Sequence, residues 1–237
     1  MSDMLYWPMV DTLLWGITSQ WLGDEAGQSS IVISILMGLL LWNIIWRSQS
    51  EVSRNLMDEI WNNNLVNLFT TPLTLKEWIT SVLGLSMIKM GITMSLLIPM
   101  VYFLYDVSFF YLGWWTLLFF FSMTFTGWWV GFLSAGIVLR KGRKVQTVIW
   151  TLPGILLPFS AIYFPVDRLS PTMQVISKAV PTSYIFENMR HLIAGNGVVF
   201  AELAISFGLN FLYLFLTLWF FVKSFKYSKN LGLDRFN

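Results

Sequence analysis

Long apolar stretches separated by short polar ones run along the whole chain. A helix rises about 1.5 Å per residue, so about 20 apolar residues are needed to cross a hydrocarbon core of about 30 Å. Six stretches approach that length, and helices are expected because they satisfy their own backbone hydrogen bonds. The predicted spans cover residues 4–22, 31–46, 79–104, 114–139, 145–163 and 198–222.

Two of these spans have unusual sequences. The stretch 4–22 carries Asp11, so an amphipathic helix lying on the membrane surface is the alternative to a retained first span. It has no Lys or Arg before its apolar run, which disfavours a secretory signal. The stretch 145–163 holds Pro153, Gly154 and Pro158, which predict a kinked or broken helix. Such a helix either lines a pathway or serves packing alone.

Two connecting segments are too long for simple turns. Within 51–76, apolar residues recur at helical spacing over about 54–69, and this pattern predicts an amphipathic surface helix that ends before Pro72. The apolar face of that helix, which includes Ile60 and Trp61, would hold it to the membrane or to other helices, and the polar face would carry Glu59, Asn62, Asn63 and Asn67. An anchor without a partner and a docking surface for a cytosolic protein fit the pattern equally well. The segment 164–197 is broken by prolines and predicts two short outer helices, at about 172–179 and 182–193.

The fourth predicted span has small residues at Gly127, Gly131 and Ala135, one every four positions. This spacing lets two helices approach closely. Dimerisation of the chain and packing within one subunit are both open on this evidence.

Composition supports a polytopic, all-α membrane protein that forms one transmembrane domain over residues 1–237. Hydrophobic residues make up 56% of the chain and charged residues 12%, against about 25% in ordinary soluble domains. The net charge of +2 gives no reason to expect nucleic acid as a partner. With no cysteine, the chain has no disulfide and no thiolate metal site.

The positions of Lys and Arg predict the orientation, since cytoplasmic loops are enriched in them. With six spans, three basic residues fall on one side, and one, Lys89, lies within a span. The remaining eleven fall on the other side with both termini, which we therefore expect in the cytoplasm. Those eleven are Arg47, Arg54, Lys76, Arg140, Lys141, Arg143, Lys144, Lys223, Lys226, Lys229 and Arg235.

Recognisable catalytic chemistry is absent from the sequence. There is no G-x-x-x-x-G-K-[ST] loop and no H-E-x-x-H pair, so the chain is not expected to be an enzyme or to bind a metal or cofactor. His191 is the only histidine, and its neighbours Glu187 and Arg190 are spaced to form a structural pair.

Charged residues inside apolar runs are functional candidates, because charge is costly at membrane depth. The clearest are Asp11 and Lys89, which are expected to face protein and to pair with each other; Asn43 is a further polar candidate. The ionisable groups look scattered, which argues against a proton-coupled carrier. Tryptophans such as Trp46 and Trp150 are expected chiefly in interfacial belts, with stacking of a substrate as the alternative.

Two stretches resemble the ABC-2 type permeases, which are the membrane subunits of ATP-driven exporters. The first is 59–78, Glu-Ile-Trp-Asn-Asn-Asn-Leu-Val-Asn-Leu-Phe-Thr-Thr-Pro-Leu-Thr-Leu-Lys-Glu-Trp, which resembles the cytoplasmic stretch before the third span in that family. The second comprises 160–166, 169–171 and 181–190, and resembles the outer segment between spans five and six. Both occur in the family's order, on six predicted spans.

The resemblance implies a dimer of six-helix subunits, each of which binds one cytosolic ATPase that carries the ATP and Mg. It also implies that the dimer lies in the inner membrane of a bacterium or archaeon, in contact with membrane lipid. The ATPase-coupling residues it implies are Glu59, Asn62, Asn63, Asn67, Phe69 and Pro72. It implies a substrate path at the dimer interface, lined largely by the second and fifth spans. The candidate residues for the path or for intramembrane polar sites are Asp11, Asn43, Lys89, Gly154 and Pro158. The corresponding outer-segment residues are Tyr184, Glu187 and Arg190. The alternative is a channel or ion-coupled carrier that works without an ATPase.

Overall fold

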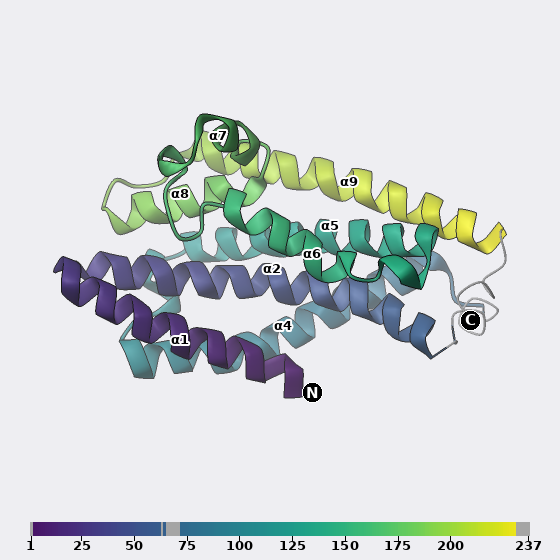
Figure 1. Ribbon diagram of the computed structural model, residues 1–237, viewed down its shortest axis with the longest axis horizontal. Helices are drawn as coiled ribbons and strands as arrows, with labels where there is room; N and C mark the ends of the chain where they lie inside the picture. The colour runs from purple at the N-terminus through teal and green to yellow at the C-terminus, as the bar shows by residue number, and fades with distance from the viewer. Residues whose placement is uncertain (1, 63, 65–71, 231–237) are drawn as a thin grey trace.

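The computed structural model describes residues 2–62, 64 and 72–230, and every element within those residues is a helix. The all-α prediction is therefore confirmed for the part of the chain that is described. Long helices run broadly along the long axis of the molecule, and shorter ones pack beside them (Figure 1). The long helices are α1 (Ser2–Ala26), α2 (Ser29–Trp61), α4 (Leu75–Tyr105), α5 (Trp115–Lys141) and α9 (Phe200–Asn230).

Short helical segments connect the long helices. They are η1 (Phe109–Leu112), η2 (Arg143–Val145), α6 (Val148–Leu156), η3 (Leu157–Phe159), η4 (Val166–Arg168), α7 (Pro171–Ser177) and α8 (Pro181–Ile193). The two short helices predicted in the segment 164–197 are present as α7 and α8. They cap the bundle toward the end opposite the last turns of α9 (Figure 1).

Four helices among the described residues are long and apolar enough to cross a membrane, namely α2, α4, α5 and α9. They correspond to the second, third, fourth and sixth predicted spans, and they make the chain a membrane protein. The first predicted span lies in α1, a continuous 25-residue helix that contains Asp11, Asp24 and Glu25.

The fifth predicted span is broken, as its prolines predicted. α6 has 9 residues, which corresponds to about 14 Å of helix and is less than half of a hydrocarbon core. It passes into the short turn η3 at Leu157, which is followed by Pro158. Ala161 then takes a left-handed backbone conformation, with φ of 58°, and no helix resumes before η4.

The helix that contains the second predicted span does not end near Trp46, because α2 continues without a break to Trp61. Some of its polar residues bond to each other along the helix. Arg47 pairs with Glu51 one turn later, and the hydroxyl of Ser53 donates to the Gln49 carbonyl oxygen at 2.8 Å. The predicted separate surface helix is therefore, up to Trp61, the end of α2. The rest of it, 65–69, lies outside the described residues.

α5 packs directly against the backbone of α2 through its small residues. A Cβ built at Gly127 would lie 2.5 Å from the Ser48 Cβ and 2.7 Å from the Ile45 carbonyl oxygen. A Cβ built at Gly131 would lie 2.7 Å from the Val52 Cβ. The small-residue spacing therefore serves packing within one subunit, which was one of the two alternatives.

A buried polar network joins α5 to α9. The Asn210 amide oxygen accepts hydrogen bonds from the Thr126 hydroxyl at 2.8 Å and the Trp129 indole at 3.1 Å. Its amide nitrogen donates to the Ser122 carbonyl oxygen at 3.1 Å. Hydrogen bonds of this kind hold helices together in lipid, because a polar side chain there has no water as a hydrogen-bond partner. α5 is thus fixed to α2 on one side and to α9 on the other.

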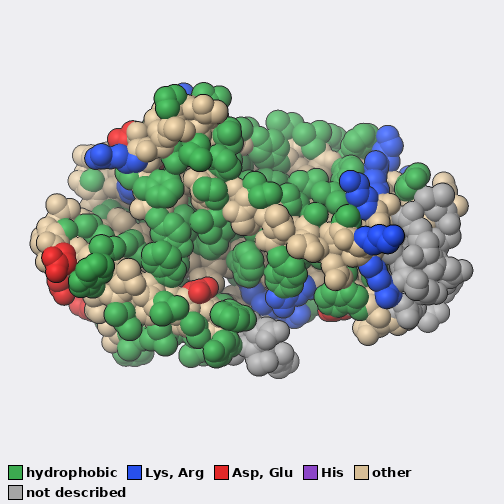
Figure 2. All heavy atoms as spheres, viewed as in Figure 1, with side chains coloured by type: hydrophobic (Ala, Val, Ile, Leu, Met, Phe, Trp, Pro, Cys, Tyr) green, Lys and Arg blue, Asp and Glu red, His purple; other side chains and the backbone are tan. Residues whose placement is uncertain are grey.

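The charged side chains lie mainly toward the ends of the molecule. Lys and Arg gather at the end where α5 and α9 finish, while Asp and Glu gather at the opposite end, near the α1–α2 turn (Figure 2). Hydrophobic side chains cover much of the face between them. Exposed apolar residues of the long helices include Phe103 on α4 and Phe215 and Trp219 on α9. Such a surface suits contact with lipid.

Candidate functional site

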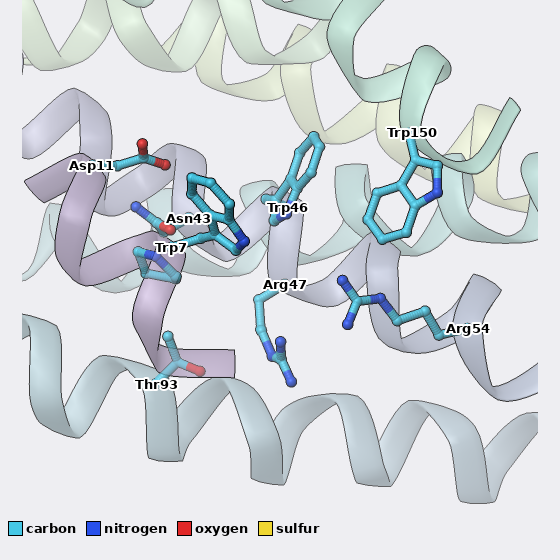
Figure 3. Close-up of a pocket in the computed structure, with 9 residues that line it drawn as sticks. Trp7, Asp11, Asn43, Trp46, Arg47, Arg54, Thr93 and Trp150 are labelled. Atoms are coloured by element: carbon cyan, nitrogen blue, oxygen red, sulfur yellow. The ribbon is translucent and has the colours of Figure 1, made fainter. Parts of the chain in front are cut away.

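A cavity of about 480 Å³ lies where α1, α2, α4 and α6 meet. In Figure 3 the α1 side chains stand on the left and Trp150 of α6 on the right, with Trp46 and Arg47 of α2 between them. The lining consists of Trp7, Pro8, Asp11, Asn43, Trp46, Arg47, Arg54, Thr93 and Trp150. A mixture of aromatic walls and a few polar groups in a volume of this size is typical of a binding site for a small molecule.

Tryptophans from three different helices form the apolar walls of the cavity. They are Trp7 on α1, Trp46 on α2 and Trp150 on α6. The ring centroids of Trp46 and Trp150 are 6.2 Å apart. The sequence interpretation favoured interfacial belts for these two residues, and both line the cavity. Trp114, in contrast, is 82% exposed, as a belt position requires.

A charged cluster lies at the α2–α4 side of the cavity. Glu51 uses both carboxylate oxygens: one accepts from the Arg47 guanidinium at 2.6 Å and the other from the Lys89 ammonium at 2.6 Å. The side chains of Glu51 and Arg47 are 3% and 7% exposed. One carboxylate therefore bridges two cations, a buried one and Lys89, whose side chain is 34% exposed.

A third cation, Arg54, reaches the cavity from the next turns of α2. Its guanidinium carbon lies 4.8 Å from the centroid of the Trp150 ring, a cation–π contact. In Figure 3 the Arg54 guanidinium points back toward Arg47. The Nε atoms of both arginines are buried and have no hydrogen-bond partner among the described residues. This side of the cavity thus carries an excess of positive charge.

The predicted pairing of Lys89 with Asp11 is wrong, because Lys89 binds Glu51. The reason is the continuation of α2: Glu51 lies inside this helix and faces α4, whereas the sequence placed it beyond the end of a span. Asp11 faces the cavity from α1, on the far side of Trp7 and Trp46 from Arg54 in Figure 3. Asn43 also lines the cavity, and its amide donates to the Leu39 carbonyl oxygen at 3.0 Å.

α6 is held against α2 by a side-chain to backbone hydrogen bond. The Gln49 amide donates to the Ile149 carbonyl oxygen at 2.9 Å, and to the Ser53 hydroxyl at 3.0 Å. Because Trp150 follows Ile149, this bond fixes the aromatic wall above Arg54. The two other α6-region candidates, Gly154 and Pro158, do not line this cavity; Gly154 is exposed, and a Cβ built there meets nothing within 4 Å.

Three of the predicted coupling residues are described, and three are not. Glu59 is half-buried in the last turns of α2 and accepts from the Asn64 amide at 2.7 Å. Asn62 is the exposed C-cap of α2, and Pro72 is exposed just before the capping box of Thr74 and Glu77 that starts α4. The predicted coupling residues Asn63, Asn67 and Phe69 lie outside the described residues.

The end of α2 is tied to the basic loop between α5 and α6. The Trp61 indole donates to the Gln146 side-chain oxygen at 3.0 Å, and the Arg143 guanidinium donates to the Ile60 carbonyl oxygen. Ile60 is buried, as the amphipathic pattern predicted, but Trp61 is 48% exposed. The sequence interpretation placed Trp61 on the anchoring face, and the structure makes it a contact to this loop.

The predicted outer-segment residues fasten α8 to the loop before it. Glu187 and Arg190 form the predicted pair at 2.9 Å. The Glu187 carboxylate also accepts from the Val166 backbone N–H at 2.7 Å, and the Arg190 guanidinium donates to the Ala161 carbonyl oxygen at 2.7 Å. The Tyr184 hydroxyl donates to the Lys178 carbonyl oxygen at 2.7 Å. Burial, with a smaller contribution from Glu202, raises the pKa of Tyr184, so this donor stays protonated at neutral pH.

Sequence reasoning missed the charged centre of the site. Glu51 was read as part of a water-exposed segment, and Arg47 and Arg54 were counted only as cytoplasmic charges. A usable signal was present, since Arg47 and Glu51 are four residues apart and Arg54 follows within one further turn, which places all three on neighbouring helical positions. Nothing in the local sequence indicated that Glu51 would pair with Lys89 on α4.

Within the described residues, no group of three or more His, Cys, Asp or Glu side chains is placed to hold a metal ion. Comparison of the chain with protein-family models and with curated proteins finds no match. The function must therefore be argued from the fold, the cavity and the sequence resemblance.

Proposed function

We propose that the chain is the transmembrane permease subunit of an ATP-driven ABC exporter, and that a separate cytosolic ATPase supplies the energy. Support comes from the two stretches that resemble ABC-2 type permeases and from the four apolar helices long enough to span a membrane. The broken α6 and the short helices α7 and α8 follow the order of elements that the resemblance implies. Two copies of the chain would bind two ATPases.

The proposed topology has six crossings with both termini in the cytoplasm of a bacterium or archaeon. α1 supplies the first crossing, and α6 together with the chain up to Tyr163 supplies the broken fifth. The end where α5 and α9 finish, with its group of Lys and Arg side chains, would then be cytoplasmic (Figure 2). The α1–α2 turn and α7 would face outward.

The observation that carries the proposal is the continuity of α2. This one helix bears the predicted docking residues Glu59 and Asn62 at its end, and it lines the cavity with residues from Asn43 to Arg54. It has 33 residues, or about 50 Å of helix, so it exceeds the hydrocarbon core by about 20 Å. A displacement of its cytoplasmic end would therefore be transmitted to the cavity without a hinge in α2.

Coupling in this scheme requires that the ATPase bind one conformation of the permease more tightly than the other. Nucleotide-driven closure of the two ATPases would push on the end of α2 and on the loop that Trp61 and Arg143 tie to it. Because Gln49 holds α6 to the same helix, Trp150 would move together with the α2 wall of the cavity.

The test is co-purification of the chain with its ATPase and measurement of ATP hydrolysis in the complex. Glu59→Lys is expected to weaken ATPase association or to uncouple hydrolysis, while the membrane protein still elutes as a folded species. Asp167→Lys is the matched control, since Asp167 is an exposed acid in η4, far along the chain from the docking end. Normal binding and hydrolysis with Glu59→Lys would contradict the docking role, and absence of any ATPase partner would contradict the proposed function.

One observation favours a second candidate, an ion-coupled carrier. The sequence interpretation set this function aside because ionisable groups looked scattered, but the structure gathers Arg47, Glu51 and Lys89. Liposomes that contain only this chain separate the two functions. Uptake driven by a pH gradient without ATPase would establish the carrier, and transport that needs the ATPase and ATP would exclude it.

A further inference from the structure

The cavity between α1, α2, α4 and α6 has two chemically different halves. Trp7, Pro8 and Trp46 offer apolar surface, and Arg47 and Arg54 offer positive charge. The division coincides with the end of the apolar run of α2 at Trp46. Trp and Arg side chains at such a boundary are characteristic of the depth of lipid headgroups.

Positive charge exceeds negative charge on the α2–α4 side. Arg47 and Lys89 share a single buried carboxylate, that of Glu51, and each takes one of its two oxygens. Asp11 is an acid that lines the cavity, and in Figure 3 Trp7 and Trp46 lie between it and Arg54. Arg54 has a cation–π contact with Trp150 and forms no salt bridge within the described part of the chain.

Two arginine atoms at this side are left without hydrogen bonds. The Nε atoms of Arg47 and Arg54 are buried and find no acceptor among the described residues. A buried donor without an acceptor is costly, and a guanidinium recognises phosphate or carboxylate by donating from several nitrogens at once. An acidic group in the cavity would supply the missing acceptors.

We propose that this cavity binds an anionic amphiphile, with a phosphate or carboxylate between Arg47 and Arg54 and an apolar chain against Trp7 and Trp46. A volume of about 480 Å³ suits an acidic headgroup with the first part of a chain. Only the further statement that this ligand is the exported substrate rests on the proposed function. Binding itself needs no ATPase.

The experiment measures binding of dodecyl phosphate to the purified full chain in a neutral maltoside detergent by native mass spectrometry. Dodecyltrimethylammonium has the same chain length with the opposite charge, and inorganic phosphate has the headgroup without the chain. We expect one dodecyl phosphate per chain, with binding at least about tenfold weaker for the other two probes, as loss of a charge-assisted hydrogen bond predicts.

Arg54→Gln is the informative variant, because Arg54 is only half-buried and, among the residues that the structure describes, has a ring contact but no salt bridge. It should weaken dodecyl phosphate binding about tenfold or more, whereas Arg168→Gln, which removes an exposed charge in η4, should leave it unchanged. Equal binding of the two amphiphiles, equal binding of inorganic phosphate, or an unchanged affinity in Arg54→Gln would each overturn the proposal.

The two proposals fail separately in these tests. If the ATPase co-purifies and dodecyl phosphate binding does not depend on Arg54, the anionic site is wrong and the exporter stands. If binding depends on Arg54 and no ATPase joins the chain, the site stands and the exporter is wrong.

Discussion

Replacing Gly131 with Ala tests the close packing of α5 on α2. The added Cβ would lie 2.7 Å from the Val52 Cβ and 3.0 Å from the Gln49 carbonyl oxygen, where ordinary contacts begin at 3.4 Å. The second of these atoms is backbone, so α2 and α5 must separate by several tenths of an ångström. Overpacking of this kind costs about 1–3 kcal/mol.

The same substitution also has a favourable term, because alanine in a helix is more stable than glycine by up to about 1 kcal/mol. We therefore expect Gly131→Ala to lower the free energy of unfolding by about 1–2 kcal/mol. The measurement is the temperature of half-denaturation in detergent, monitored by size-exclusion chromatography, which should fall. Gly91→Ala in α4 is the control, since a Cβ there meets nothing within 4 Å and only the favourable term remains. The two variants should therefore shift in opposite directions. A Gly131→Ala protein that is as stable as Gly91→Ala would refute the described packing of α2 on α5.

Two further predictions concern the charged cluster and the topology. Glu51→Gln should destabilise the protein by about 3 kcal/mol, because it leaves the guanidinium of Arg47 buried without its counter-charge. The Glu51→Gln, Lys89→Met double variant should lose less than the sum of the two singles in the same thermal assay, and strict additivity would show that the pair is not coupled. Single cysteines introduced at Lys144 and Ser170 of this cysteine-free chain should react with an impermeant thiol reagent from opposite sides of intact cells. Reaction of both from the outside would rule out the proposed topology.

Local sequence patterns were sufficient for most of the helices. The predicted spans 79–104, 114–139 and 198–222 fall within a few residues of α4, α5 and the first part of α9. The prolines predicted the break in the fifth span and the approximate starts of α7 and α8, because a proline ring restricts the backbone wherever it occurs. These features depend on residues close together in sequence, so a single chain reveals them.

The extent of α2 and its buried charges depend on distant residues. Arg47 resembles the end of a span until the structure shows that Glu51, its partner, also binds Lys89 of α4. Asn210 likewise lies in an apolar helix, α9, and its partners Thr126 and Trp129 belong to α5. No periodicity in the sequence encodes such pairings.

The candidate site was predicted in part. Asp11 and Asn43 were singled out as polar residues in apolar helices, and both line the cavity. Gly154 and Pro158 were chosen for backbone reasons and lie away from it. The arginines were missed because an excess of positive charge near a membrane surface is usually an orientation signal.

The hydrogen bond from Gln49 to Ile149 also sets a requirement on how the protein is made. Its two partners are separated by 100 residues. At about 5–20 residues per second, a ribosome takes about 5–20 s to deliver Ile149 after Gln49 has emerged. Throughout that interval α2 lacks the α6 carbonyl oxygen, and for most of it α2 also lacks the glycine face of α5 against its polar positions. The insertion machinery must therefore retain α2, or shield its polar stripe from lipid, until the second half of the chain has been synthesised.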